Sequence, residues 1–146
     1  MKQGTRFPPP AELLPHAGSA VLLDGILSHT DEVIEAAANI TSAHPFFVAD
    51  YGVPVWVGVE LMAQAIAAHA GLSGRRAGRA PRRGMLLGTR RYHAQTNWFE
   101  DGARLIVRAE REFGGEGGMA VCVCRIDCDG RTLAEARITI IEEEDK

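Results

Sequence analysis

The chain has 146 residues, 46% of them hydrophobic, and this length fits one domain that can bury most of a core unaided. Its 16 basic and 19 acidic residues leave a net charge of −3, which excludes a general attraction to nucleic acid or anionic lipid. Three cysteines close together do not make a disulfide framework, and the polar, Pro-rich residues 1–10 lack an apolar signal core. We therefore expect a single cytoplasmic domain over residues 1–146 with reduced thiols.

In chain order, the first half predicts two strands followed by a loop and one long helix. The expected elements are a flexible opening over 1–10, a helical turn over 11–15, strands over 20–27 and 33–40, a loop over 46–54 and a helix over 55–71. The helix is apolar on every face, which is typical of a helix in a protein interior. It contains Glu60, Gln64 and His69, and is too short and too polar for a membrane span, which needs about 20 mostly apolar residues.

The second half predicts an antiparallel sheet. A Gly- and Arg-rich loop over 73–84 precedes strands over 85–97, 104–113, 119–127 and 132–141, and the charged tail 142–146 is expected to be flexible. Turns fall at 100–102 and 114–118, and Asp129-Gly130 is a strong two-residue hairpin signal. One apolar helix among about six antiparallel strands is buried most economically when the sheet curves around it. The sequence therefore predicts the α+β hot-dog fold, and such small curved sheets often pair as dimers.

The most informative residues are Glu60 and Gln64, one helical turn apart in this apolar helix. Burying an ionised carboxylate is costly, so an inward Glu60 must be paired, hydrogen-bonded, protonated or beside water. Residues at i and i+4 share a face, so the Gln64 amide can hydrogen-bond or orient the carboxylate. The pair suits general acid–base chemistry, and the alternative is a structural carboxylate satisfied by backbone and an arginine.

At this point the sequence resembles a known family. Leu14-Pro15-His16, Leu22-Leu23-Asp24, Pro45-Phe46-Phe47 and Glu60-Leu61-Met62-Ala63-Gln64 follow the order of landmarks in FabZ-type 3-hydroxyacyl-acyl-carrier-protein dehydratases, and the resemblance spans about residues 13–141. The stretch 53–56 that leads into the helix is more similar to the ApeP-like, dehydratase-like hot-dog proteins of aryl-polyene pigment clusters. The resemblance implies a hydro-lyase of aryl-polyene or fatty-acid type biosynthesis, acting on substrates carried by acyl carrier protein.

The resemblance also implies a catalytic pair, of which this chain keeps half. Glu60 matches the family's helix glutamate, but the loop is shorter and its His-Phe-Pro-Gly sequence is missing. Aligned from Pro45-Phe46-Phe47, the position of the histidine falls on Asp50. His44 is a second candidate base, and the alternative for it is a strand-end histidine that is hydrogen-bonded to backbone. The third option is a histidine from another chain, as implied for a heterodimeric dehydratase.

Other residues are expected to bind substrate or carrier. Backbone N–H groups at the helix start, near Val57 and Gly58, can polarise a thioester carbonyl. Trp56 either walls the acyl pocket or fills the core. A cluster of five arginines is expected in the loop after the helix: Arg75, Arg76, Arg79, Arg82 and Arg83. Its positive charge would attract an acidic carrier protein or the phosphates of pantetheine. The alternative is that these arginines only keep the loop solvated.

We expect no metal and no cofactor beyond the phosphopantetheine of the carrier, because Cys122, Cys124 and Cys128 lack a second ligand cluster. The sequence-based prediction is a 3-hydroxyacyl-carrier-protein dehydratase, acting as a homodimer or heterodimer, with Glu60 as acid. One alternative is a hot-dog thioesterase. Another is a non-catalytic acyl-binding or scaffold subunit, which the missing histidine favours.

Overall fold

The fold is given by a computed structural model that describes residues 7–14, 18–78, 84–114 and 118–142. The expected flexible residues 1–6 and 143–146, and the Pro15-His16 landmark, lie outside these ranges. The helical elements are η2 (Pro10–Glu12), η3 (Gly18–Ala20), η4 (Val55–Val57) and α1 (Gly58–Arg76). The strands are β1 (Gly25–His29), β2 (Val33–Asn39), β3 (Val53–Pro54), β4 (Gly84–Ala94), β5 (Trp98–Phe99), β6 (Arg104–Gly114), β7 (Met119–Cys128) and β8 (Arg131–Glu142).

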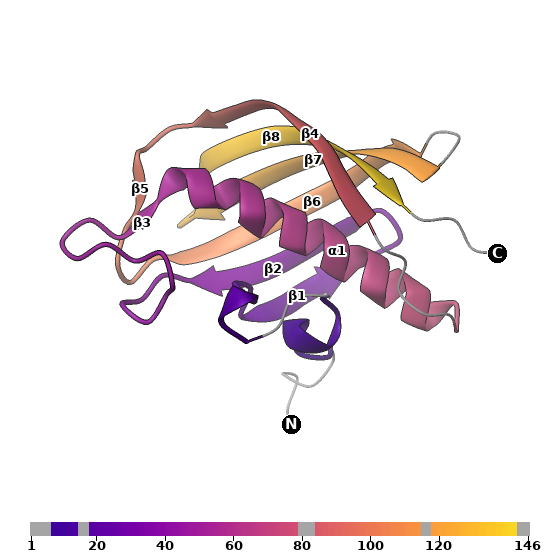
Figure 1. Ribbon diagram of the computed structural model, residues 1–146, viewed down its shortest axis with the longest axis horizontal. Helices are drawn as coiled ribbons and strands as arrows, with labels where there is room; N and C mark the ends of the chain where they lie inside the picture. Colours follow the sequence, from indigo (N-terminus) through magenta and orange to yellow (C-terminus); the bar gives the residue numbers. More distant parts are fainter. Residues whose placement is uncertain (1–6, 15–17, 79–83, 115–117, 143–146) are drawn as a thin grey trace.

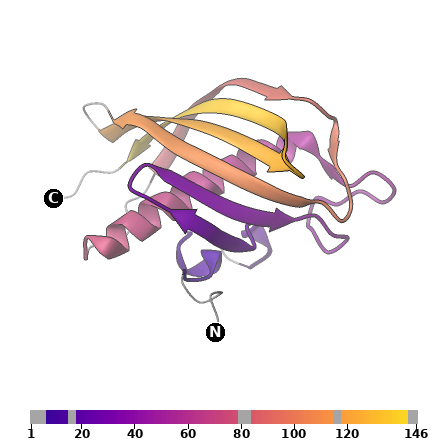
Figure 2. The same ribbon diagram turned by 180° about the vertical axis from the view of Figure 1, so that it is seen from behind.

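Six strands form one antiparallel sheet in the order β1-β2-β6-β7-β8-β4, and β3 pairs with β5 separately. The sheet curves around α1, which crosses its concave face (Figure 1). Figure 2 shows the open outer face of the same sheet from behind. The predicted hot-dog fold is confirmed, with one helix packed against a curved antiparallel sheet.

The core lies between the concave face and α1. Successive strand residues point to opposite faces, and on β7 the buried positions alternate regularly. These positions are Ala120, Cys122, Cys124 and Ile126. The helix contributes Leu61, Met62, Ala65, Ile66, Ala68 and Leu72. The helix is apolar on every face because sheet, turns and N-terminal segment enclose most of it.

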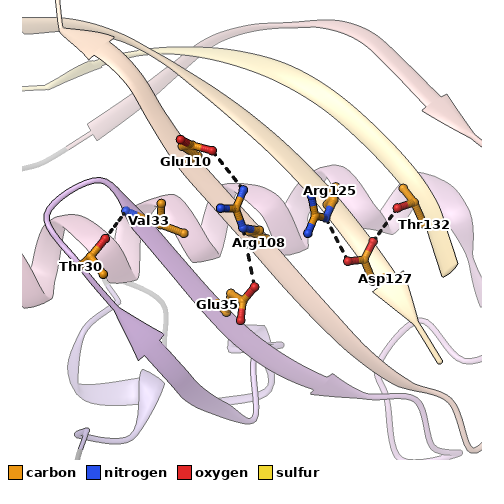
Figure 3. Close-up of polar contacts among 8 residues, drawn as sticks. All are labelled: Thr30, Val33, Glu35, Arg108, Glu110, Arg125, Asp127 and Thr132. Atoms are coloured by element: carbon orange, nitrogen blue, oxygen red, sulfur yellow. Dashed lines mark hydrogen bonds and ion pairs between the residues drawn. The ribbon is translucent and has the colours of Figure 1, made fainter. Parts of the chain in front are cut away.

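The outer face of the sheet carries polar side chains instead (Figure 3). Arg108 on β6 lies 3.6 Å from Glu35 on β2 and 3.1 Å from Glu110. On the next hairpin Arg125 pairs with Asp127, which also accepts a hydrogen bond from Thr132. Because such exposed pairs each contribute about 0–1 kcal/mol, they solvate this face more than they stabilise the fold.

Several predicted boundaries differ from the structure, by the most at the end of the long helix and at the start of the first strand. The helix continues to Arg76, so Arg75 and Arg76 lie in its last turn and not in the loop predicted from residue 73. Nothing breaks the helix before Gly78, whose φ of +72° ends it. The first strand begins at Gly25 rather than at residue 20, since η3 and the following residues bond to the helix instead of to a strand.

The extended helix also bears on the question of membrane insertion. Val55–Arg76 is long and apolar enough to cross a membrane by length and composition alone, in contrast to the shorter stretch predicted from sequence. However, 61% of its most apolar window is buried inside the domain. It is a core helix of this fold.

Candidate functional site

Glu60 lies in the first turn of α1, and Gln64 fixes its carboxylate. The Gln64 amide nitrogen donates to Glu60 Oε2 at 2.9 Å, so the bond predicted from the i, i+4 spacing is present. Gln64 is fully buried, whereas Glu60 is half-buried. The structure therefore places a held, partly exposed carboxylate at the edge of the core.

Gln64 also ties the N-terminal segment to the helix. Its amide nitrogen donates to the Ala20 carbonyl at 2.7 Å, and its Oε1 accepts from the Leu22 N–H at 2.8 Å. Both amide hydrogens and one acceptor position are therefore used. A side chain with all its polar partners in place cannot rotate freely, so the orientation of the Glu60 carboxylate is set by a segment about forty residues away in sequence.

The start of the helix is built from η4 and the first residue of α1. The Gly58 N–H donates to the carbonyls of Val55 and Trp56, and Val57 is buried. Trp56 is 62% exposed, so it does not fill the core of this chain. Its ring instead meets the Phe46 ring edge-on, with centroids 5.6 Å apart, and this contact brings the loop after β2 against the helix start.

His44 lies on that loop, and the lone pair of its ring already accepts a hydrogen bond from the backbone. Its Nδ1 accepts the Phe46 N–H at 3.1 Å, which places the proton of the neutral ring on Nε2. The Nε2 atom is buried and has no hydrogen-bond partner. Burial lowers the His44 pKa, and Asp24 opposes this only in part. The ring borders a hollow of about 210 Å³ that Asp24 and Asn39 also line. A base must offer a lone pair to the proton it takes, and this arrangement offers none.

Asp50 occupies the tip of a tight turn. Val48 and Gly52 are bridged by two backbone hydrogen bonds, and between them Asp50 has a φ of +73° and is exposed. Aspartate is one of the few residues other than glycine that tolerate this left-handed conformation. Its carboxylate is accessible to solvent or to a second chain.

The arginine cluster is described only in part. Arg75 and Arg76 are exposed at the C-terminal end of α1, whereas Arg79, Arg82 and Arg83 lie outside the described residues. Arg75 also pairs with Glu12 at 3.5 Å, a contact between two exposed groups. The end of the helix thus carries positive charge, partly offset by one carboxylate.

The cysteines form no ligand cluster. Cys122 and Cys124 are buried on the core face of β7, and burial raises the pKa of the Cys124 thiol far above its ordinary value. Within the described part of the chain, no three His, Cys, Asp or Glu side chains are arranged to hold a metal ion. Buried thiols of this kind behave as small apolar groups.

Sequence reasoning missed two features. His29 and His69 are buried side by side with ring centroids 4.7 Å apart, although they lie forty residues apart in the chain. Tyr92, on β4, donates its hydroxyl to the Val55 carbonyl at 2.5 Å, at the start of the helix. Neither contact has a local spacing that would reveal it, because both depend on how the sheet curves over α1.

The fold and the site together define a hot-dog protein with an amide-held carboxylate near the start of its central helix. This chain belongs to the ApeP-like dehydratase family, because the ApeP dehydratase family model matches residues 8–146. No curated protein sequence matches the chain.

Solved structures agree with this assignment. The dehydratase heterocomplex ApeI:P from Xenorhabdus doucetiae superposes with a TM-score of 0.88 and 26% identity, covering 96% of this chain and 94% of that one. A hypothetical thioesterase with coenzyme A from Streptococcus pneumoniae reaches 0.66 at 13% identity, covering 83% and 86%. The PaaI protein of E. coli reaches 0.63 at 15% identity, covering 80% of each chain. The last two likenesses show the fold alone.

Proposed function

We propose that this chain is one subunit of a heterodimeric dehydratase that removes water from 3-hydroxyacyl thioesters carried on acyl carrier protein. The observation that carries the proposal is the Glu60 carboxylate, held by Gln64 at 2.9 Å in a dehydratase family member that lacks the family's His-Phe-Pro-Gly loop. The ApeI:P structure is itself a heterocomplex of dehydratase subunits, which supports a second, paralogous hot-dog chain as partner.

The reaction needs an acid and a base. A base takes the proton from C2 of the acyl chain, the C3–O bond breaks as the acid gives its proton to the leaving hydroxyl, and a trans C2=C3 double bond and water result. Glu60 is the acid. Its carboxyl group has to be protonated before each turnover. The base gains one proton from C2 as Glu60 gives one to the leaving hydroxyl, so the number of protons on the two groups together is unchanged.

The base is best supplied by the partner. The lone pair of His44 Nδ1 is occupied by the Phe46 N–H, and its Nε2 is buried. Asp50 is exposed at the tip of a tight turn and is not enclosed in a site. A histidine, whose ordinary pKa is near 6.5, suits the task better, and at the position of the family's loop histidine this chain carries Asp50 instead.

Substrate and carrier binding use both ends of α1. Backbone N–H groups at the start of the helix, near Val57, are proposed to polarise the thioester carbonyl. The Gly58 N–H, also expected there, already donates to the carbonyls of Val55 and Trp56. The exposed Trp56 is proposed to wall the acyl chain once the partner covers it. Arg75 and Arg76 are proposed to attract the acidic carrier protein. The enzyme is proposed to be cytoplasmic, in polyene or fatty-acid type biosynthesis, and to need no cofactor beyond the carrier's phosphopantetheine.

The test is mass-spectrometric detection of water loss from a 3-hydroxyacyl carrier protein. The chain is assayed alone and co-purified with a paralogous hot-dog subunit that keeps a loop histidine. We expect turnover only from the pair, and its loss with Glu60→Gln. The control Glu135→Gln removes an exposed carboxylate from the outer face of β8 and should leave turnover intact.

Each other outcome overturns a defined part of the proposal. Robust turnover by the chain alone would remove the need for a partner and return His44 and Asp50 as bases. Undiminished turnover by the Glu60→Gln pair would make this chain a scaffold or acyl-binding subunit. Release of a free acid in place of an enoyl product would make it a thioesterase.

A further inference from the structure

An irregularity in β4 aims one aromatic side chain at the start of α1. Opposite β8 the pairing runs through Thr89↔Ile138 and Arg90↔Arg137, then shifts, and resumes with His93↔Glu135 and Ala94↔Ala134. Ile138 and Ala134 are both fully buried, so their partners share the inward face. Residues 89 and 94 would face opposite sides of a regular strand, and the extra residue of a β-bulge brings them to the same side.

The bulge falls at Arg91 and Tyr92, and it carries strain. Arg91 has a φ of +55°. This left-handed conformation is unfavourable for a residue other than glycine. In return the strand parity reverses, so that Tyr92 packs against the core while Arg91 and His93 are exposed. Relative to Thr89, the bulge therefore moves Tyr92 from the outward to the inward face of the strand.

The Tyr92 hydroxyl ends at the first turn before α1. It donates to the Val55 carbonyl at 2.5 Å, and the same carbonyl accepts the Gly58 N–H. Both acceptor positions of Val55 are thus used. Burial raises the pKa of Tyr92 to about 12, so the hydroxyl keeps its proton and remains a donor at neutral pH.

Gly58 makes this approach possible. A Cβ at this position would overlap the Tyr92 hydroxyl oxygen, and would also lie 3.0 Å from Ile126 Cδ1. Glycine in a helix costs roughly 1 kcal/mol relative to alanine, so its presence at the first residue of α1 has a steric reason here. The bulge at Arg91 thus brings the Tyr92 hydroxyl against Gly58, which lies two residues before Glu60.

We propose that Tyr92 is a positioning residue that locks η4 and the first turn of α1, and thereby places Trp56 and Glu60 for the reaction. This inference rests on the dehydratase function proposed above. Tyr92 acts on η4 through its bond to the Val55 carbonyl, and Glu60 lies in the helical turn that η4 begins.

The test uses Tyr92→Phe, Gly58→Ala and the double variant in the reconstituted pair. Tyr92→Phe keeps the ring and removes only the hydroxyl, and we expect kcat to fall roughly 10-fold, within the range for misplaced catalytic groups, with little change in KM. Gly58→Ala should cost more. Adding Tyr92→Phe should recover part of that loss, because the overlapping oxygen is gone. His93→Gln, the exposed neighbour, is the control.

A second measurement does not depend on turnover. In a Trp98→Phe background Trp56 is the single tryptophan and sits within η4, so its emission reports the position of this turn. We expect Gly58→Ala to shift the emission and the added Tyr92→Phe to move it back. Unchanged kcat and emission in Tyr92→Phe, or no recovery in the double variant, would overturn the inference. If the wild-type pair removes no water, the proposed function fails and emission alone decides the positioning role.

Discussion

Gln64 shows how one side chain joins the helix, the N-terminal segment and the candidate acid. Its four-residue spacing from Glu60 predicted their hydrogen bond, since neighbours on a helix face are fixed by local geometry. Its bonds to Ala20 and Leu22 were not predictable, because no local rule pairs residues forty positions apart. The sequence thus indicated an orienting role and missed the anchoring one.

Replacing Gln64 with leucine should destabilise the fold and reduce activity together. The change leaves the buried Leu22 N–H without its partner, at about 1–3 kcal/mol, and also removes the bond to the carbonyl of the exposed Ala20. We expect a loss of about 2–4 kcal/mol in the free energy of unfolding, measured by urea denaturation. Gln95→Leu, at an exposed position, should stay within about 0.5 kcal/mol. An equal loss in both variants would contradict the anchoring role.

At the scale of elements, Gly52 joins the loop after β2 to β5. Its φ is +107°, and a Cβ would overlap the Phe99 carbonyl oxygen. Gly102 has a similar φ of +88°, but nothing lies within 4 Å of its Cβ position. Replacing Gly102 therefore tests the cost of backbone strain alone, and replacing Gly52 tests strain together with steric overlap.

Gly52→Ala should destabilise the protein more than Gly102→Ala. The Gly102 variant bears only the cost of a left-handed alanine, about 1–2 kcal/mol, whereas the Gly52 variant must also push β5 away from the loop. Thermal unfolding of both variants, followed by calorimetry, measures the difference. Equal melting temperatures would show that the loop yields without cost and that its attachment to β5 is weak.

The buried histidine pair makes the contact between β1 and α1 sensitive to pH. His69 Nε2 donates to the Thr30 carbonyl at 3.0 Å, and the His29 ring packs against the His69 ring. Burial lowers the pKa of His29, and the neighbouring His69 and Arg76 lower it further. In the unfolded chain His29 titrates near pH 6.5, so below that pH the unfolded state binds more protons than the folded state.

Stability should therefore be fully present above about pH 6.5 and fall as the pH drops below it. The free energy of unfolding, measured by urea denaturation between about pH 7.5 and 5.5, should decline less steeply in His29→Gln than in the wild type. His93→Gln removes an exposed histidine and should keep the wild-type slope. Identical slopes in all three proteins would exclude His29 as the source of the pH dependence.

At the scale of the whole molecule, the sequence predicted the fold class better than its detail. The periodicity of one apolar helix and the turn signals between strands were enough for a sheet wrapped around a helix. The strand order β1-β2-β6-β7-β8-β4 and the bulge at Arg91 were not accessible, since pairing between distant strands leaves no periodic signal. The bond from Tyr92 to the Val55 carbonyl was missed because it depends on how the sheet curves over α1.

The charge of the molecule is unevenly distributed, and this supports a last prediction. The net charge is −3, yet Arg75 and Arg76 are exposed together at the end of α1. An acidic carrier protein would be repelled by the molecule as a whole and attracted to this end, so the local field would decide where it docks. The Glu12 carboxylate beside Arg75 weakens that field without cancelling it.

Arg76→Glu should therefore weaken carrier-protein binding several-fold at low salt. Arg131→Glu, at the exposed first residue of β8, changes the net charge by the same amount and should have a smaller effect. Calorimetric titration of the pair with carrier protein at low salt, and again near 0.5 M salt, would measure both. Screening should shrink the difference between the variants at high salt, because the Debye length falls to a few Å. Equal weakening by the two substitutions would mean that total charge, and not the end of α1, governs the encounter.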